Sequence, residues 1–180
     1  YLFTALFLII NGAGLYLGNL VYEKACKLKP ASMLAVYNIY KYTFDDQKFY
    51  GLLKEDIEIK SDFGYNLYGT YINNPKKGTK DTIIIVHGLR DNRWSSMKYA
   101  AMYIDKGFNV LVYDSRSHGE SGGDSITYGY YEKYDLDRMV DFVVNKNGSA
   151  TIGVHGESMG AATALLHSKM NEKEKRVTFY

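Results

Sequence analysis

Ser158 lies between two glycines, Gly156 and Gly160, in the sequence Gly-Glu-Ser-Met-Gly. The apolar run over residues 151–155 predicts a buried strand before this motif, and the apolar spacing over residues 158–170 predicts a helix after it. A sharp turn from strand to helix holds such a serine in a strained backbone and exposes its hydroxyl, and the glycines leave room for neighbouring chain. The chemistry available to Ser158 is nucleophilic attack on an acyl carbon.

Acyl transfer at such a serine needs two preorganised donors for the oxyanion. We expect the first to be the backbone N–H of Met159, at the positive end of the predicted helix. We expect the second to be the N–H of Leu89, which follows His87 and Gly88 directly after a predicted buried strand over residues 82–86. Gly88 lets the backbone approach a substrate closely. His87 is expected to be a structural histidine that hydrogen-bonds this loop, not a catalytic one.

A third group, Asp114, Arg116 and His118, follows a predicted strand over residues 109–113. The three segments, in this order and spacing, resemble the α/β-hydrolases over residues 54–180. The Asp-x-Arg-x-His-Gly-x-Ser run is similar to the branch that includes monoacylglycerol lipases and serine-aminopeptidase-like hydrolases, some of whose bacterial members are membrane-anchored. The resemblance implies that Asp114, Arg116 and His118 organise loops, with an Asp114–Arg116 pair supporting the oxyanion loop.

The resemblance also implies a function. It suggests a serine hydrolase that acts on carboxylic ester, thioester or amide bonds of a small-molecule or lipid-like acyl substrate, with no cofactor and no metal. The serine in the motif disfavours relatives that use an aspartate nucleophile. The alternative is a non-catalytic α/β-hydrolase-like scaffold that binds a ligand or partner at the membrane. Dinucleotide binding is disfavoured, because no Gly-x-Gly-x-x-Gly follows the first strand.

The activating base and acid are not evident in the sequence. In this fold the chain order is serine, then acid, then histidine. The histidine that follows Ser158 is His167, nine residues later, which a helix places on the opposite face. His155 precedes the serine and is expected to point into the sheet. The resemblance puts both groups beyond Tyr180, so we expect residues 1–180 to be part of a longer hydrolase and inactive alone.

Composition excludes several other functions. The 180 residues carry a net charge of +2, which gives no electrostatic argument for nucleic-acid binding. The single cysteine, Cys26, rules out a disulfide within the chain and a metal site built from several cysteines.

Residues 1–22 contain no charged residue, and about 20 apolar residues span a bilayer as a helix. We interpret them as a single-pass anchor, although Asn11 and Asn19 would bury amides in hydrocarbon. A signal peptide is the rival, but a clear cleavage site is not found. Three lysines after the anchor weakly favour a domain on the cytoplasmic side of the membrane. Taken as a whole, we favour the extracytoplasmic side, and the side of the membrane is left open. These lysines are Lys24, Lys27 and Lys29.

The remaining pattern predicts a connecting segment over residues 23–53, with a short helix over 30–42, and then an α/β domain. Apolar alternation over 56–60 and 67–72 predicts an antiparallel hairpin. Strands and helices then alternate, which indicates a mostly parallel sheet with helices on both faces. Five aromatic residues near the predicted strand ends could line a pocket, although ordinary packing explains most of them. They are Trp94, Tyr128, Tyr130, Tyr131 and Tyr134.

Overall fold

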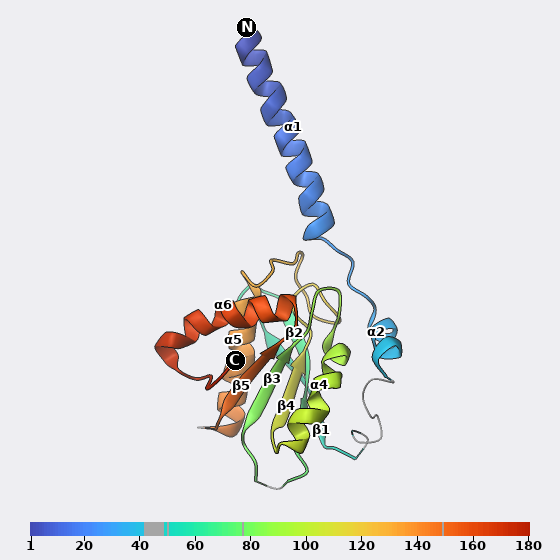
Figure 1. The fold of residues 1–180 in the computed structure, drawn as a ribbon, viewed down its shortest axis with the longest axis vertical. Helices are drawn as coiled ribbons and strands as arrows, with labels where there is room; N and C mark the ends of the chain where they lie inside the picture. The colour runs from blue at the N-terminus through green and yellow to red at the C-terminus, as the bar shows by residue number, and fades with distance from the viewer. Residues whose placement is uncertain (42–48, 50, 77, 149) are drawn as a thin grey trace.

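The computed structural model describes residues 1–41, 49, 51–76, 78–148 and 150–180, and its centre is a mixed sheet (Figure 1). The strands lie in the order β1-β2-β4-β3-β5. β1 pairs antiparallel with β2, β2 antiparallel with β4, and β3 parallel with both β4 and β5. The predicted α/β fold with an antiparallel N-terminal hairpin is therefore confirmed. The strands are β1 Lys54–Lys60, β2 Asn66–Ile72, β3 Thr82–Val86, β4 Asn109–Tyr113 and β5 Ile152–Gly156.

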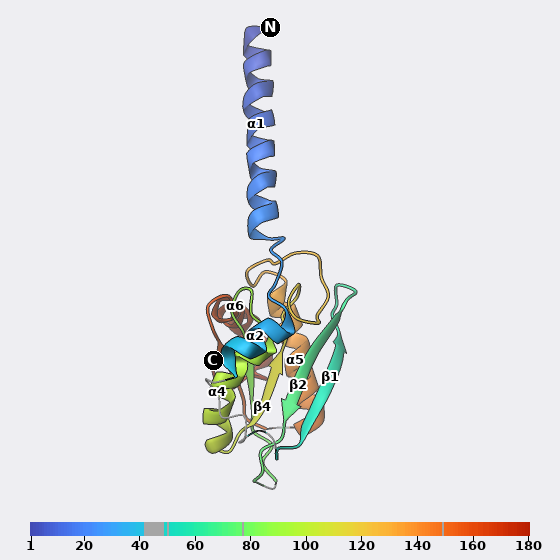
Figure 2. The same cartoon turned by 90° about the vertical axis from the view of Figure 1, so that its right-hand side faces the viewer.

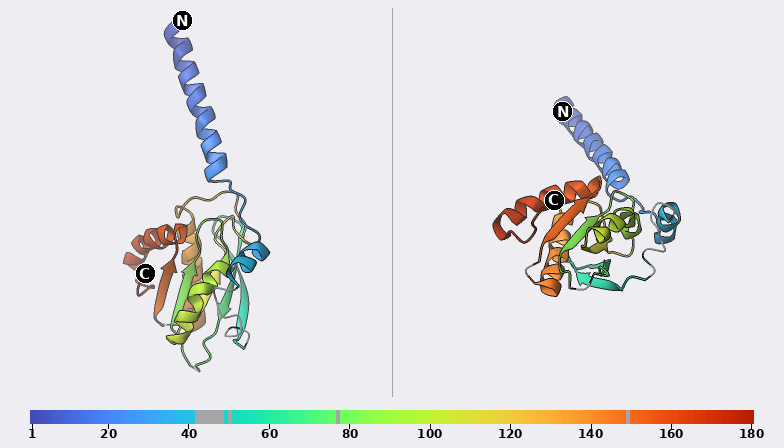
Figure 3. Two further views of the ribbon diagram at one scale, coloured as in Figure 1. Left: turned by 45° about the vertical axis from the view of Figure 1, so that its right-hand side comes forward. Right: turned by 60° about the horizontal axis from the view of Figure 1, so that its bottom comes forward.

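Helices cover both faces of this sheet, as expected for strands joined by crossover connections (Figure 3). α4, Arg93–Asp105, packs on one face, and the short helix α2, Met33–Tyr40, packs on α4. α5, Glu132–Asn147, and α6, Met159–Glu174, pack together on the other face. The core therefore has two apolar layers, one on each side of the sheet.

β3 shows how the sequence builds both layers. All five of its residues are buried, and successive side chains in a strand point to opposite faces. Ile83 and Ile85 belong to the cluster that contains Met97 of α4. Ile84 and Val86 belong to the cluster on the α5 side. A run of apolar β-branched residues suits a strand that is buried on both faces.

α1, Leu2–Ala25, is a 24-residue helix that projects away from the sheet (Figures 1 and 2). It contains no buried residue, an 18-residue window of it has a mean hydropathy of 1.6, and it is long enough to cross a membrane. The Asn11 side-chain amide donates to the carbonyl oxygen of Phe7 at 2.8 Å, which lowers the cost of placing that amide in hydrocarbon. The helix expected over residues 30–42 is α2, and residues 42–48 and 50 of the expected connecting segment lie outside the described residues.

Candidate active site

Ser158 forms the junction between β5 and α6. Its φ of 53° and ψ of −113° lie in a region that side-chain-bearing residues rarely adopt. The Ser158 residue is exposed, whereas Met159 beside it is buried. The backbone N–H of Glu157 donates to the carbonyl oxygen of Val86 at 3.0 Å, which ties the junction to the end of β3. The fold thus places Ser158, exposed, at the carboxyl end of the parallel strands.

The two glycines of the motif are required by close backbone contacts. A Cβ added to Gly156 would lie 2.4 Å from the carbonyl oxygen of Gly160. A Cβ added to Gly160 would lie 2.1 Å from the carbonyl oxygen of Val86. Both distances are far below van der Waals contact, and backbone atoms cannot move aside as a flexible side chain can. The motif glycines therefore let α6 cross the end of β3 closely.

The loop after β3 reaches the same point. A Cβ built on Gly88 would lie 3.5 Å from the Cβ of Ser158 and 3.6 Å from the carbonyl oxygen of Glu157. The backbone N–H groups of Leu89 and Met159 have no protein acceptor among the hydrogen bonds of the described residues. Met159 is also the first residue of α6, where the helix dipole favours negative charge. Within the described residues both N–H groups are therefore left without a protein acceptor.

His87 and His118 hold the loops after β3 and β4 together. The Nε2 of His87 accepts the backbone N–H of Ser115 at 3.0 Å, and the Nε2 of His118 accepts that of Arg90 at 3.1 Å. The Nδ1 atoms of the two histidines donate to the carbonyl oxygens of Gly88 and Arg116. Both rings are therefore neutral and fully bonded. Burial lowers the pKa of His87 to about 3 and also lowers the pKa of His118.

Asp114 forms its ion pair with Arg93, and not with Arg116 as we expected. The Nη1 of Arg93 lies 2.8 Å from Oδ2 of Asp114, and the Arg93 backbone N–H donates to Oδ1 at 2.7 Å. Burial raises the pKa of Asp114, while the positive charge of Arg93 opposes that rise. Sequence reasoning missed Arg93, because no spacing rule links the first turn of α4 to a carboxylate 21 residues later. The one feature of the sequence that pointed to Arg93 was its position just after the Gly88 loop.

Comparisons with known proteins identify the family of this chain. Residues 77–178 match the family model described as serine aminopeptidase, S33. The chain belongs to the S33 serine aminopeptidase-like family of α/β-hydrolases. YqkD of Bacillus subtilis (strain 168), an uncharacterized protein, is 45% identical over 123 residues, which cover 68% of this chain and 40% of YqkD.

Two further relatives have named activities. The esterase Pf2001 of Pyrococcus furiosus is 31% identical with a TM-score of 0.63, over 74% of this chain and 51% of the esterase. Human gastric triacylglycerol lipase is 26% identical, over 86% of this chain and 44% of the lipase. The chain thus spans about half the length, or less, of the relatives it matches.

In this S33-family chain Arg116 has a different environment from the one expected. Its guanidinium lies 5.3 Å from the centre of the Tyr65 ring and 5.0 Å from that of the Tyr131 ring. Such contacts between a cation and an aromatic face are attractive. The side chain therefore connects the β4 loop to the start of α5, and not to Asp114.

The other two histidines are held by partners outside the loops after β3 and β4. His167 is buried on α6, where its Nε2 lies 3.0 Å from Oδ1 of Asp137 and its Nδ1 lies 2.6 Å from the hydroxyl of Tyr180. The Nδ1 of His155 lies 2.9 Å from the hydroxyl of Tyr103 on α4. Each ring thus has a structural partner in the packing between elements.

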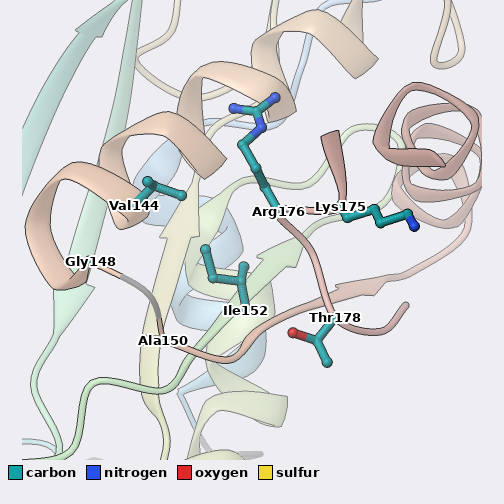
Figure 4. A pocket seen from close by; sticks show the side chains of 7 residues that line it. All are labelled: Val144, Gly148, Ala150, Ile152, Lys175, Arg176 and Thr178. Atoms are coloured by element: carbon teal, nitrogen blue, oxygen red, sulfur yellow. The ribbon is translucent and has the colours of Figure 1, made fainter. Parts of the chain in front are cut away.

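Figure 4 shows a cavity of about 410 Å³ near the start of β5, with Ile152 at its wall. Of its polar side chains, Arg176 is held by Asp137 at 2.5 Å and also pairs with Asp141. No residue of the Ser158 site lines this cavity. Within the described residues no group of three His, Cys, Asp or Glu side chains could hold a metal ion.

Proposed function

We propose that the protein is a serine hydrolase that cleaves carboxylic ester, thioester or amide bonds, with Ser158 as the nucleophile. The observation that carries this proposal is the positive φ of Ser158, an unfavourable conformation held between β5 and α6 with the residue exposed. Membership of the S33 family supports the same class of reaction. The named relatives Pf2001 and gastric lipase, an esterase and a triacylglycerol lipase, favour an acyl ester as the substrate.

In the proposed reaction the hydroxyl oxygen of Ser158 attacks the substrate carbonyl carbon while a general base takes the hydroxyl proton. The backbone N–H groups of Leu89 and Met159 bind the oxyanion that forms. Collapse of this intermediate breaks the bond to the leaving group, which takes the proton from the base, and leaves the acyl group on Ser158. Water then attacks the acyl-enzyme in the same way and releases the acid.

The general base in this proposal is not one of the four histidines of residues 1–180. His87, His118 and His167 have protein partners at both ring nitrogens, and His155 contacts Tyr103. A histidine and its carboxylate partner would then come from a longer form of the chain. Residues 1–180 alone are accordingly proposed not to turn over esters.

We also propose that residues 1–22 are an uncleaved membrane anchor, that residues 23–53 connect it to the domain, and that residues 54–180 carry the site. The length and apolar composition of α1 support the anchor. The carbonyl oxygens of Ala25 and Cys26 accept from the Tyr128 hydroxyl and the Ile126 N–H, each at 2.8 Å. These two hydrogen bonds fix the end of α1 to the domain.

Activity-based labelling tests the nucleophile. A longer form of the protein, containing the region homologous to the rest of YqkD, is expected to hydrolyse a short-chain ester and to react with a fluorophosphonate at Ser158. Ser158→Ala should lower kcat by roughly 10³-fold or more. Ser168→Ala, a change to a serine within α6, should leave both reactions intact. Labelling of Ser158→Ala at the wild-type rate would refute the assignment.

A second experiment addresses the base. Residues 1–180 alone should react with the fluorophosphonate far more slowly than the longer form. Reaction at a normal enzyme rate would show that a base lies within these residues. The competing function, a non-catalytic scaffold at the membrane, predicts that the longer form hydrolyses none of the three bond types and that Ser158→Ala changes nothing.

A further inference from the structure

α1 joins the domain at the same end of the sheet as Ser158, where the parallel strands finish. The hydroxyl of Tyr128 donates to the Ala25 carbonyl oxygen at the end of α1, and the N–H of Ala31 donates to the Arg90 carbonyl oxygen at 3.1 Å. Arg90 follows Leu89 in the loop after β3. The chain leaving α1 therefore runs along the loops that surround Ser158, and Figures 1 and 2 show α1 projecting from this end of the domain.

The loop that holds α1 continues into a group of exposed aromatic side chains, which we call the tyrosine rim. Four of its five rings contact one another, with 4.9 Å between the centres of Tyr130 and Tyr131 and 4.8 Å between those of Phe63 and Tyr131. Tyr130 is 61% exposed. The ammonium group of Lys133 lies about 5 Å from the rings of both Tyr130 and Tyr134. The rim consists of Phe63, Tyr128, Tyr130, Tyr131 and Tyr134.

A buried carboxylate holds the loop of the rim in place. Glu132 accepts hydrogen bonds from the N–H groups of Thr127 and Gly129, at 2.7 and 2.8 Å, and from the Thr127 hydroxyl at 2.5 Å. Gly129 also lies against α6, since a Cβ added there would be 2.9 Å from Leu166. Leu165 and Leu166 are exposed on that helix, which begins immediately after Ser158. The apolar surface thus extends from the rim onto the helix of the candidate nucleophile.

The composition of this surface suits the headgroup layer of a bilayer. Tyrosine is enriched there because its ring is apolar and its hydroxyl is polar, and lysine can extend its ammonium group to water. α1 is 24 residues long, or about 36 Å, enough to cross a hydrocarbon core of about 30 Å. Its end is bonded to Tyr128, so a membrane-spanning α1 brings the tyrosine rim to the membrane surface.

We propose that the tyrosine rim lies in the headgroup layer next to α1, so that the Ser158 site opens toward the bilayer and takes its acyl substrate, an ester of a membrane lipid, from the adjacent leaflet. This inference rests on the proposed hydrolase function for its substrate, but the orientation of the domain can be measured separately. A soluble partner protein on the rim is the competing occupant, and it would keep the rim out of contact with lipid.

Fluorescence quenching by brominated lipids measures the orientation. The chain with α1 in place is reconstituted into phosphatidylcholine vesicles with and without dibrominated acyl chains. Tyr130→Trp reports on the rim, and Leu53→Trp, at an exposed position just before β1, is the matched control. Both variants retain Trp94, so its contribution is common to the two. We expect strong additional quenching for Tyr130→Trp and none for Leu53→Trp, and equal quenching would overturn the orientation.

Activity on two esters tests the source of the substrate. The longer form of the protein is assayed with a diacylglycerol ester in vesicles and with a short-chain ester in water. Tyr130→Asp should lower the ratio of vesicle to soluble activity by roughly five-fold or more, whereas Leu53→Asp should not change it. An unchanged ratio for Tyr130→Asp would contradict the proposal that the substrate is a membrane lipid. Absence of both wild-type activities would refute the hydrolase function, and the quenching result would still decide the orientation.

Discussion

His87 and His118 are bonded reciprocally, each accepting a backbone N–H from the loop that carries the other. Their ring centres lie 5.0 Å apart, and Nε2 to N distances of 3.0 and 3.1 Å join His87 to Ser115 and His118 to Arg90. The loop with the proposed donor Leu89 is therefore held to the loop after β4 by two neutral imidazoles. Protonation of either Nε2 would remove its acceptor and break one of these connections.

The first prediction concerns acid stability. Burial holds the pKa of His87 at about 3, against 6.5 for a free histidine, so below pH 6.5 the unfolded chain takes up a proton that the folded chain does not. The contribution of neutral His87 to stability is thus complete above pH 6.5 and is lost as the pH falls toward 3. Urea unfolding from pH 7 to 4 should show this loss, and His87→Gln should flatten it. An equally steep decline in His87→Gln would contradict the prediction.

The second prediction concerns the pair of Arg93 and Asp114. Arg93→Met leaves the Asp114 carboxylate buried without its counter-charge, so the free energy of unfolding should fall by about 3–5 kcal/mol. Arg138→Met is the control, because Arg138 is 35% exposed where it pairs with Asp141, and its loss should cost under about 1 kcal/mol. Thermal unfolding in detergent measures both variants. Similar losses would mean that burial of the pair is unimportant.

The third prediction concerns the close crossing at Gly160. Alanine is the better helix former by about 1 kcal/mol, yet Gly160→Ala places a methyl group 2.1 Å from the Val86 carbonyl oxygen. We expect it to destabilise the domain by at least about 3 kcal/mol. Gly51→Ala meets no atom within 4 Å and should change stability by under about 0.5 kcal/mol. Urea unfolding compares the two, and a stable Gly160→Ala would show that the crossing can relax.

The fourth prediction separates stability from activity at Ser158. Glycine adopts the observed φ of 53° without the steric cost that serine and alanine share. Ser158→Gly should therefore have a free energy of unfolding about 1 kcal/mol higher than that of Ser158→Ala, although both should be inactive in the longer form. Denaturant unfolding of the two variants makes the comparison. Equal stabilities would indicate that the backbone at Ser158 is not strained.

Much of this protein is determined by local features of the sequence. Alternating apolar residues predicted the hairpin of β1 and β2, and the continuous run at β3 predicted a strand buried on both faces, because side-chain direction repeats every two residues. The spacing of Gly156, Ser158 and Gly160 predicted a strand–helix turn, which the structure has. These features depend on periodicity and backbone sterics, which act over a few residues.

Only the tertiary structure decided which distant groups meet. Asp114 pairs with Arg93 rather than with Arg116, two residues away, because α4 begins beside the end of β4 while the Arg116 side chain lies over aromatic rings. The contact of Tyr128 with the end of α1, which brings the tyrosine rim next to the anchor, likewise joins residues 103 positions apart. Such pairings depend on how the loops at the strand ends fold against one another, and no short-range pattern in the chain specifies that.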